Sequence, residues 1–178
     1  MKETEVIERI KEMFEENFER LRLEGGHAMT EDVKNIALNQ VIYYYKKMKH
    51  VAERVTETEV KLTLPNQRSQ KGRDFTIEGV VDIIREENET WMYDIKTHDP
   101  DYIRDNIELY ENQLDVYAHI WQELRKQPLD HTAIISTSYP KGLKDALLTN
   151  DLFRIEDEMK KWDPLIEMPL SQESVDEK

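Results

Sequence analysis

Apolar residues recur every three or four positions through two long segments at the start of the chain. Over residues 3–23 this spacing predicts an amphipathic helix that ends at the glycines near Gly25. In the second segment Thr30 can cap a helix whose apolar stripe runs from Val33 to Val51. We therefore expect two helices ahead of the first strand.

The pattern then changes to alternation of apolar and polar residues, which is typical of strands. A strand is predicted over about residues 54–64, followed by a polar loop over 66–74. Two more strands, at about 75–85 and 90–96, are separated by a tight turn at 87–89. The three strands should therefore be antiparallel neighbours.

The remainder of the chain returns to helical spacing with one interruption. A helix is predicted over residues 106–126, a buried strand over 132–137 and a last helix within 151–161. This order predicts an α/β fold of the α+β type, with a central mixed sheet flanked by helices. We expect one domain over residues 1–169 and a disordered acidic tail over 170–178.

Composition narrows the function classes. The chain of 178 residues has no cysteine, which excludes disulfides, thiolate metal sites and cysteine nucleophiles. No apolar run approaches the length of a membrane span and the N-terminus is charged, so we expect a soluble, cytoplasmic protein with no membrane partner. The net charge of -13 argues against a broad electrostatic grip on nucleic acid, unless a bound cation, a partner subunit or a small basic groove offsets it.

One local basic cluster stands out in this acidic chain. Arg68, Lys71 and Arg73 lie within the polar loop between the first two predicted strands. Lysine and arginine are the side chains that neutralise phosphates, so these three are candidate substrate-binding residues.

Two carboxylates and an ammonium are expected to share one surface of the sheet. Asp94 and Lys96 project from the same face because side chains alternate along a strand. A turn centred on Asn88 places Asp82 directly opposite Asp94 on the neighbouring strand. Opposed like charges destabilise a sheet, and Mg²⁺ or Mn²⁺ would offset that repulsion. The hairpin therefore predicts half of a metal site.

These residues also resemble the motifs of a known family. Gly79-Val-Val-Asp82 followed by Asp94-Ile-Lys96 resembles the G-x-x-D and D-x-K motifs of PD-(D/E)xK nucleases. Gln113 and Tyr117 resemble the Q-x-x-x-Y motif of the RecB-like branch, here without the iron–sulfur cysteines. The resemblance implies a restriction-endonuclease-like core.

The resemblance further implies the metal ligands. His27 resembles the metal-binding histidine of the RecB-like branch, and Asp82 and Asp94 would bind the same Mg²⁺ or Mn²⁺. The backbone carbonyl of Ile95 would contribute an oxygen. Lys96 would position or activate the attacking water.

Gln113 and Tyr117 share one face of their predicted helix because they are four residues apart, so both could line the same cleft as catalytic and substrate-binding residues. Core packing and a buried hydrogen bond are the alternative reading. The implied function is metal-dependent hydrolysis of DNA phosphodiester bonds, as an exonuclease or endonuclease in repair, recombination or phage DNA processing. A helicase or another protein would be the partner. A noncatalytic DNA-binding or assembly subunit and an RNA substrate remain the alternatives.

Overall fold

The computed structural model describes residues 2–25 and 30–176, which form two compact units, Met1–Glu53 and Arg54–Lys178. The sequence predicted a single domain over residues 1–169, whereas the structure has its first two helices in a unit of their own. Among the residues described, no helix is long and apolar enough to cross a membrane.

The first unit is a pair of helices, as predicted. Helix α1 spans Glu3–Leu23 and α2 spans Glu31–Ala52, and the Thr30 hydroxyl accepts a hydrogen bond from the Val33 N–H at 3.4 Å as an N-cap. An ion pair of 3.0 Å between Lys49 and Glu3 joins the two helices. The predicted capping residue and helical ranges are confirmed.

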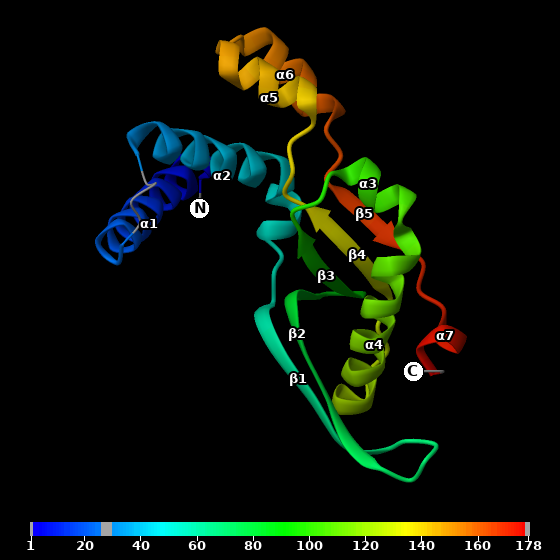
Figure 1. The fold of residues 1–178 in the computed structure, drawn as a ribbon. Coiled ribbons are helices and arrows are strands. Elements are labelled where there is room, and N and C mark those ends of the chain that lie inside the picture. Colours follow the sequence, from blue (N-terminus) through cyan, green and yellow to red (C-terminus); the bar gives the residue numbers. More distant parts are fainter. Residues whose placement is uncertain (1, 26–29, 177–178) are drawn as a thin grey trace. The chain divides into compact units, whose positions relative to one another are not determined.

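The second unit is built on a mixed sheet of five strands in the order β1-β2-β3-β4-β5, drawn in Figure 1. Strands β3 and β4 are parallel and the other neighbours are antiparallel. The strands are β1 Glu57–Arg68, β2 Asp74–Glu86, β3 Thr90–Lys96, β4 His131–Ser136 and β5 Leu165–Met168. The helices of this unit are α3 Pro100–Asp105, α4 Ile107–Arg125, α5 Lys141–Thr149, α6 Leu152–Lys161 and α7 Gln172–Asp176.

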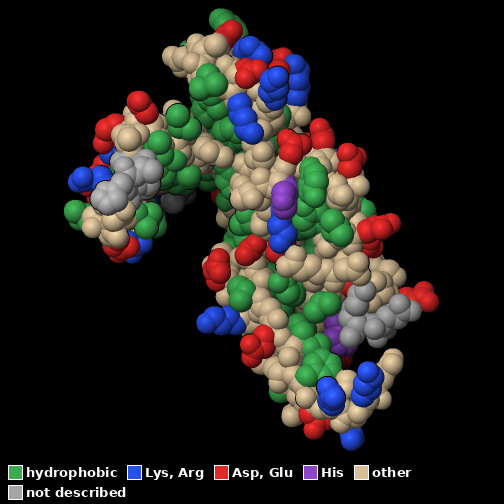
Figure 2. Space-filling view, viewed as in Figure 1, with side chains coloured by type: hydrophobic (Ala, Val, Ile, Leu, Met, Phe, Trp, Pro, Cys, Tyr) green, Lys and Arg blue, Asp and Glu red, His purple; other side chains and the backbone are tan. Residues whose placement is uncertain are grey.

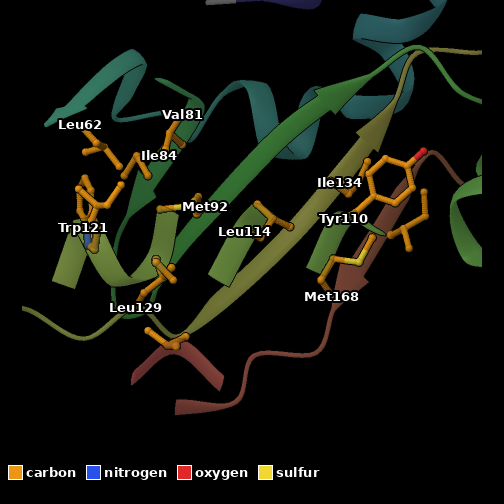
Figure 3. Packing of buried hydrophobic residues seen from close by; sticks show 14 of the residues in the cluster. Leu62, Val81, Ile84, Met92, Tyr110, Leu114, Trp121, Leu129, Ile134 and Met168 are labelled. Carbon is orange, nitrogen blue, oxygen red and sulfur yellow. The ribbon is translucent and has the colours of Figure 1, made fainter. Parts of the chain in front are cut away.

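The hydrophobic core lies between the sheet and α4. Leu114 and Trp121 of α4 pack with Val81, Met92 and Ile134 from three strands, as Figure 3 shows. A helical stripe meeting alternate strand positions is the arrangement that the two periodicities predict. The predicted mixed sheet with flanking helices is therefore confirmed.

The first hairpin is longer than predicted. Strand β1 continues through Pro65 to Arg68, because β1 is an edge strand and an edge position tolerates a residue without an N–H. Asn66 adopts a positive φ of 61° at a register shift between Leu64 and Gln67. The bulge lets the strand continue past Pro65 and Asn66, where the sequence predicted that it would end.

The C-terminal segment also differs from its predicted disorder. Residues Gln172–Asp176 form α7, and the Val175 side chain is only 1% exposed. The Ser174 hydroxyl donates a hydrogen bond to the buried carboxylate of Asp115 on α4. A segment with so few apolar residues gave no periodic signal, yet one valine and one polar contact fix it to the core.

Candidate active site

The β2–β3 hairpin has the register that the sequence predicted. The last paired residues are Ile83 and Tyr93, and continuing this register by one residue sets Asp82 opposite Asp94. At this position the Ile95 N–H donates a hydrogen bond of 2.6 Å to Asp82 Oδ2, a side-chain acceptor, instead of to a backbone carbonyl of β2. Asp82 is thus held beside the segment that carries Asp94.

Asp94 is buried between β2 and β4, with 4% of its surface exposed. Its Oδ2 forms an ion pair of 2.6 Å with the Lys96 ammonium. Burial raises the pKa of the Asp94 carboxyl; the Lys96 charge opposes that shift and the Asp82 charge adds to it. The net increase means that one nearby ammonium does not fully compensate the buried carboxylate.

Lys96 is held from α4 as well as from its own strand. Its Nζ donates a hydrogen bond of 3.1 Å to Gln113 Oε1, and Gln113 Nε2 donates to the Tyr117 hydroxyl at 2.9 Å. Gln113 and Tyr117 are one helical turn apart, so the amide bridges the tyrosine and the lysine. The structure therefore brings together Asp82, Asp94, Lys96, Gln113 and Tyr117, as the sequence predicted.

Gly79 has a steric role that sequence reasoning did not identify. A Cβ atom at this position of β2 would lie 2.5 Å from Tyr117 Cε1 and 3.0 Å from Tyr117 Cδ1. The tyrosine ring thus lies against the backbone of β2, where only glycine leaves room. The sequence showed Gly79 as a motif position, and only the packing shows what occupies the missing side chain's place.

The chemistry of the site suits a hard divalent cation. Mg²⁺ is usually held by one or two carboxylates and keeps several waters, which Asp82, Asp94 and the Ile95 carbonyl can satisfy. Asp94 Oδ2 is buried and, its ion pair with Lys96 aside, accepts no hydrogen bond within the described part of the chain. Among described residues no group of three or more histidine or acidic side chains is placed to hold a metal, and His27 lies outside them.

The basic cluster is remote from these residues. Arg68 ends β1, while Lys71 and Arg73 lie in the loop that joins it to β2. Along β2 the loop is separated from Asp82 by roughly 27 Å at about 3.4 Å per residue. Figures 1 and 2 show the hairpin projecting beyond the other strands, with basic side chains gathered at its tip. The structure does not bring these three residues to the carboxylates.

Comparison with known proteins gives one family. A model described as the PD-(D/E)XK nuclease superfamily matches residues 1–170. No curated protein matches the chain. A solved structure described as "Crystal structure of SSO0001" is similar over 97% of this chain and 80% of that one, with 17% identity and a TM-score of 0.40, a likeness too low to carry an argument.

The family match agrees with the geometry. The mixed five-stranded sheet with flanking helices is consistent with the restriction-endonuclease-like fold of this superfamily, so that expectation is confirmed. Its members are nucleases, and they generally use divalent metal ions. With the match covering nearly the whole chain and the motif residues meeting in one cluster, this chain belongs to the PD-(D/E)XK nuclease superfamily.

Proposed function

We propose that this protein is a Mg²⁺- or Mn²⁺-dependent deoxyribonuclease of the RecB-like branch. The observation that carries the proposal is the clustering of Asp82, Asp94 and Lys96 at the end of β3, where the backbone ladder between β2 and β3 gives way to a side-chain contact. A buried carboxylate with a raised pKa beside a second carboxylate is costly to the fold, which favours a functional reason for keeping it.

The proposed metal ligands are the carboxylates of Asp82 and Asp94 and the backbone carbonyl of Ile95; His27, the further ligand that the family resemblance implies, lies outside the described residues. The donor set supports this assignment, since carboxylate and carbonyl oxygens suit Mg²⁺ and an added imidazole suits Mn²⁺. The bound cation would supply the Lewis acidity that phosphodiester hydrolysis requires.

Lys96 is proposed to stabilise negative charge at the reacting phosphate and to position the attacking water. Its ammonium has three N–H donors, of which Asp94 and Gln113 engage two. Among the described residues no other group engages the third donor, so it can point toward substrate, and charged donors are the strongest stabilisers of an oxyanion.

Gln113 and Tyr117 complete the proposed site as the residues that line its cleft. The pair orients the Lys96 ammonium, because the Gln113 side chain that accepts from Nζ is itself hydrogen-bonded to the Tyr117 hydroxyl. A donor that is already oriented loses little conformational entropy as negative charge develops on the substrate, and this lowers the activation free energy of the reaction.

The β1–β2 hairpin is proposed to bind the DNA backbone at a distance from the cut. Residues 65–73 contain Arg68, Lys71 and Arg73 but no acidic residue, in a chain whose net charge is -13. Replacing both Lys71 and Arg73 by alanine should lower the salt dependence of binding by about 0.7 per lost single-strand phosphate contact. The same double change at Lys141 and Lys144 on α5 is the matched control, and an equal effect there would contradict the assignment.

The proposed setting is DNA repair, recombination or phage DNA processing in the cytoplasm. A helicase or another protein partner would supply the broad positive surface that an acidic chain lacks. The same net charge favours the second candidate, a noncatalytic DNA-binding or assembly subunit that retains the fold.

Cleavage of end-labelled single-stranded DNA, double-stranded DNA and RNA distinguishes these functions. Each substrate is incubated with the native protein and Mg²⁺, Mn²⁺ or EDTA. The proposal predicts metal-dependent cleavage of DNA and none in EDTA. Cleavage of RNA alone would change the substrate, and binding without cleavage in either metal would establish the noncatalytic subunit.

A further inference from the structure

The row of polar contacts between β3 and α4 continues one step beyond Lys96. Asp94 and Lys96 alternate onto one side of β3, and His98 follows two residues after the strand ends. Just as Gln113 on α4 contacts Lys96, Tyr110 one turn earlier on α4 contacts His98, with 2.9 Å between the tyrosine hydroxyl and His98 Nδ1. His98 is therefore the next side chain along the surface that carries the proposed reaction.

His98 is exposed but firmly anchored. Its backbone carbonyl accepts a hydrogen bond of 2.6 Å from the hydroxyl of Ser136, a fully buried residue at the end of β4. Its ring meets the buried Tyr110 edge-on at 6.2 Å between centroids. The contact with Tyr110 occupies Nδ1 and leaves Nε2 available. In the tautomer in which the tyrosine hydroxyl donates, the proton is on Nε2, which is then a donor.

A second aromatic ring lies against this imidazole. Tyr102 of α3 is 47% exposed and its ring centroid is 5.1 Å from that of His98, with the planes tilted by 34°. Helix α3 begins directly after His98, where the Asp99 carboxylate caps it by accepting from the Asp101 N–H at 2.9 Å. The Asn106 side chain also binds the Tyr102 carbonyl at 2.8 Å. The Tyr102 ring is therefore exposed, while hydrogen bonds fix the backbone of α3 at its start and near its end.

We propose that His98 and Tyr102 form a nucleotide-binding platform for single-stranded DNA beside the proposed cleavage site. The exposed Tyr102 ring stacks on a base, and His98 Nε2 donates a hydrogen bond to a phosphate next to the one that is cut. Aromatic faces bind single strands with little sequence preference because every base offers a stacking face. This inference rests on the proposed nuclease function and names the strand form that the site takes.

The test compares three variants on two substrates. Tyr102→Ala removes the stacking ring, His98→Ala removes the donor, and Tyr110→Phe removes only the hydroxyl that orients the imidazole. The first substrate is an end-labelled single-stranded oligonucleotide with Mg²⁺, and the second is a strand of the same length built from tetrahydrofuran abasic residues, which keeps the phosphates but has no base to stack. Loss of a stacked base in Tyr102→Ala should raise KM for the oligonucleotide about 10-fold or more and leave KM for the abasic strand unchanged. His98→Ala removes a phosphate contact, so it should raise KM for both strands.

Two positions away from the platform serve as controls. His119→Ala removes a histidine two residues past Tyr117 on α4, which helical geometry turns away from the site. Phe153→Ala removes a highly exposed aromatic ring on α6. Neither should change KM for the oligonucleotide. A Tyr110→Phe variant with an intermediate increase in KM would show that the orientation of His98 matters.

The platform and the nuclease can fail separately. Binding of the fluorescent oligonucleotide, measured by anisotropy in EDTA, needs no hydrolysis, and it should weaken in Tyr102→Ala and His98→Ala relative to the controls. Native-like binding and KM in both variants would overturn the platform even if the native protein cleaves DNA. A native protein that binds through these residues but cleaves nothing would refute the nuclease and retain the platform.

Discussion

Replacing Asp82 by asparagine should stabilise the metal-free protein and abolish its stabilisation by metal. The asparagine Oδ1 can still accept the hydrogen bond that Asp82 receives from the Ile95 N–H at 2.6 Å. What changes is the charge beside Asp94, whose carboxyl is already buried and has a raised pKa. The native site thus carries a repulsion that the variant lacks.

The magnitude follows from the geometry of opposed strand positions. Cβ atoms directly across an antiparallel pair are about 5 Å apart, and two unit charges at that separation repel by about 3 kcal/mol at an effective dielectric of 20. Lys96 and solvent reduce this, and a neutral hydrogen bond is weaker than a charged one by about 1 kcal/mol. The net gain should be about 1 kcal/mol, or roughly 2–4 °C in Tm for a chain of this size.

Thermal unfolding in EDTA and then in excess Mg²⁺ provides the assay. The native protein should gain about 2.7 kcal/mol when free metal is 100-fold above Kd, so the order of stability reverses when metal is added. Asp130→Asn is the matched control, since Asp130 also accepts a backbone N–H, from Thr90 at 2.7 Å, near the opposite end of β3. The control should lose stability in EDTA, because its hydrogen bond is weakened and no repulsion is relieved. If Asp82→Asn also loses stability in EDTA, and the order of stability does not reverse in Mg²⁺, the reasoning is refuted.

Two further predictions concern the same cluster. Burial makes the pKa of the Asp94 carboxyl higher in the folded than in the unfolded protein, so its contribution to stability is largest in acid and is lost as pH rises from about 4 through the raised pKa. Denaturant titrations in EDTA should show the native protein losing stability relative to Asp94→Asn over that window. A constant difference between the two proteins would contradict this. Gly79→Ala should displace Tyr117, cost about 1–3 kcal/mol and reduce cleavage, whereas Gly142→Ala, whose new methyl group meets only the flexible carboxylate end of Glu158, should do neither when unfolding and cleavage are measured side by side.

The part of the site that sequence predicted is the part governed by local rules. The turn at residues 87–89 fixes the register of β2 against β3, and that register alone sets Asp82 opposite Asp94. The four-residue spacing on α4 likewise puts Gln113 and Tyr117 on one face. These relations need only alternation and helical periodicity.

What sequence did not predict depends on contacts between distant segments. Strand β5 has only four residues and α3 only six, too short for a periodic signal, although Asp99 followed by Pro100 is a helix-start pattern that was available. Helix α5 was not predicted either. The closeness of Gly79 to Tyr117 is a tertiary contact that no spacing along the chain encodes.

The most direct test of the account is Mg²⁺-dependent cleavage of end-labelled DNA by Lys96→Met. Methionine preserves much of the side-chain length but removes the ammonium between Asp94 and Gln113. Lys144→Met on the exposed surface of α5 is the control, and circular dichroism checks that both variants are folded. The account predicts that the native protein and the control cleave DNA in Mg²⁺ but not in EDTA, and that Lys96→Met loses at least about 100-fold in rate; cleavage by Lys96→Met at the native rate would contradict it.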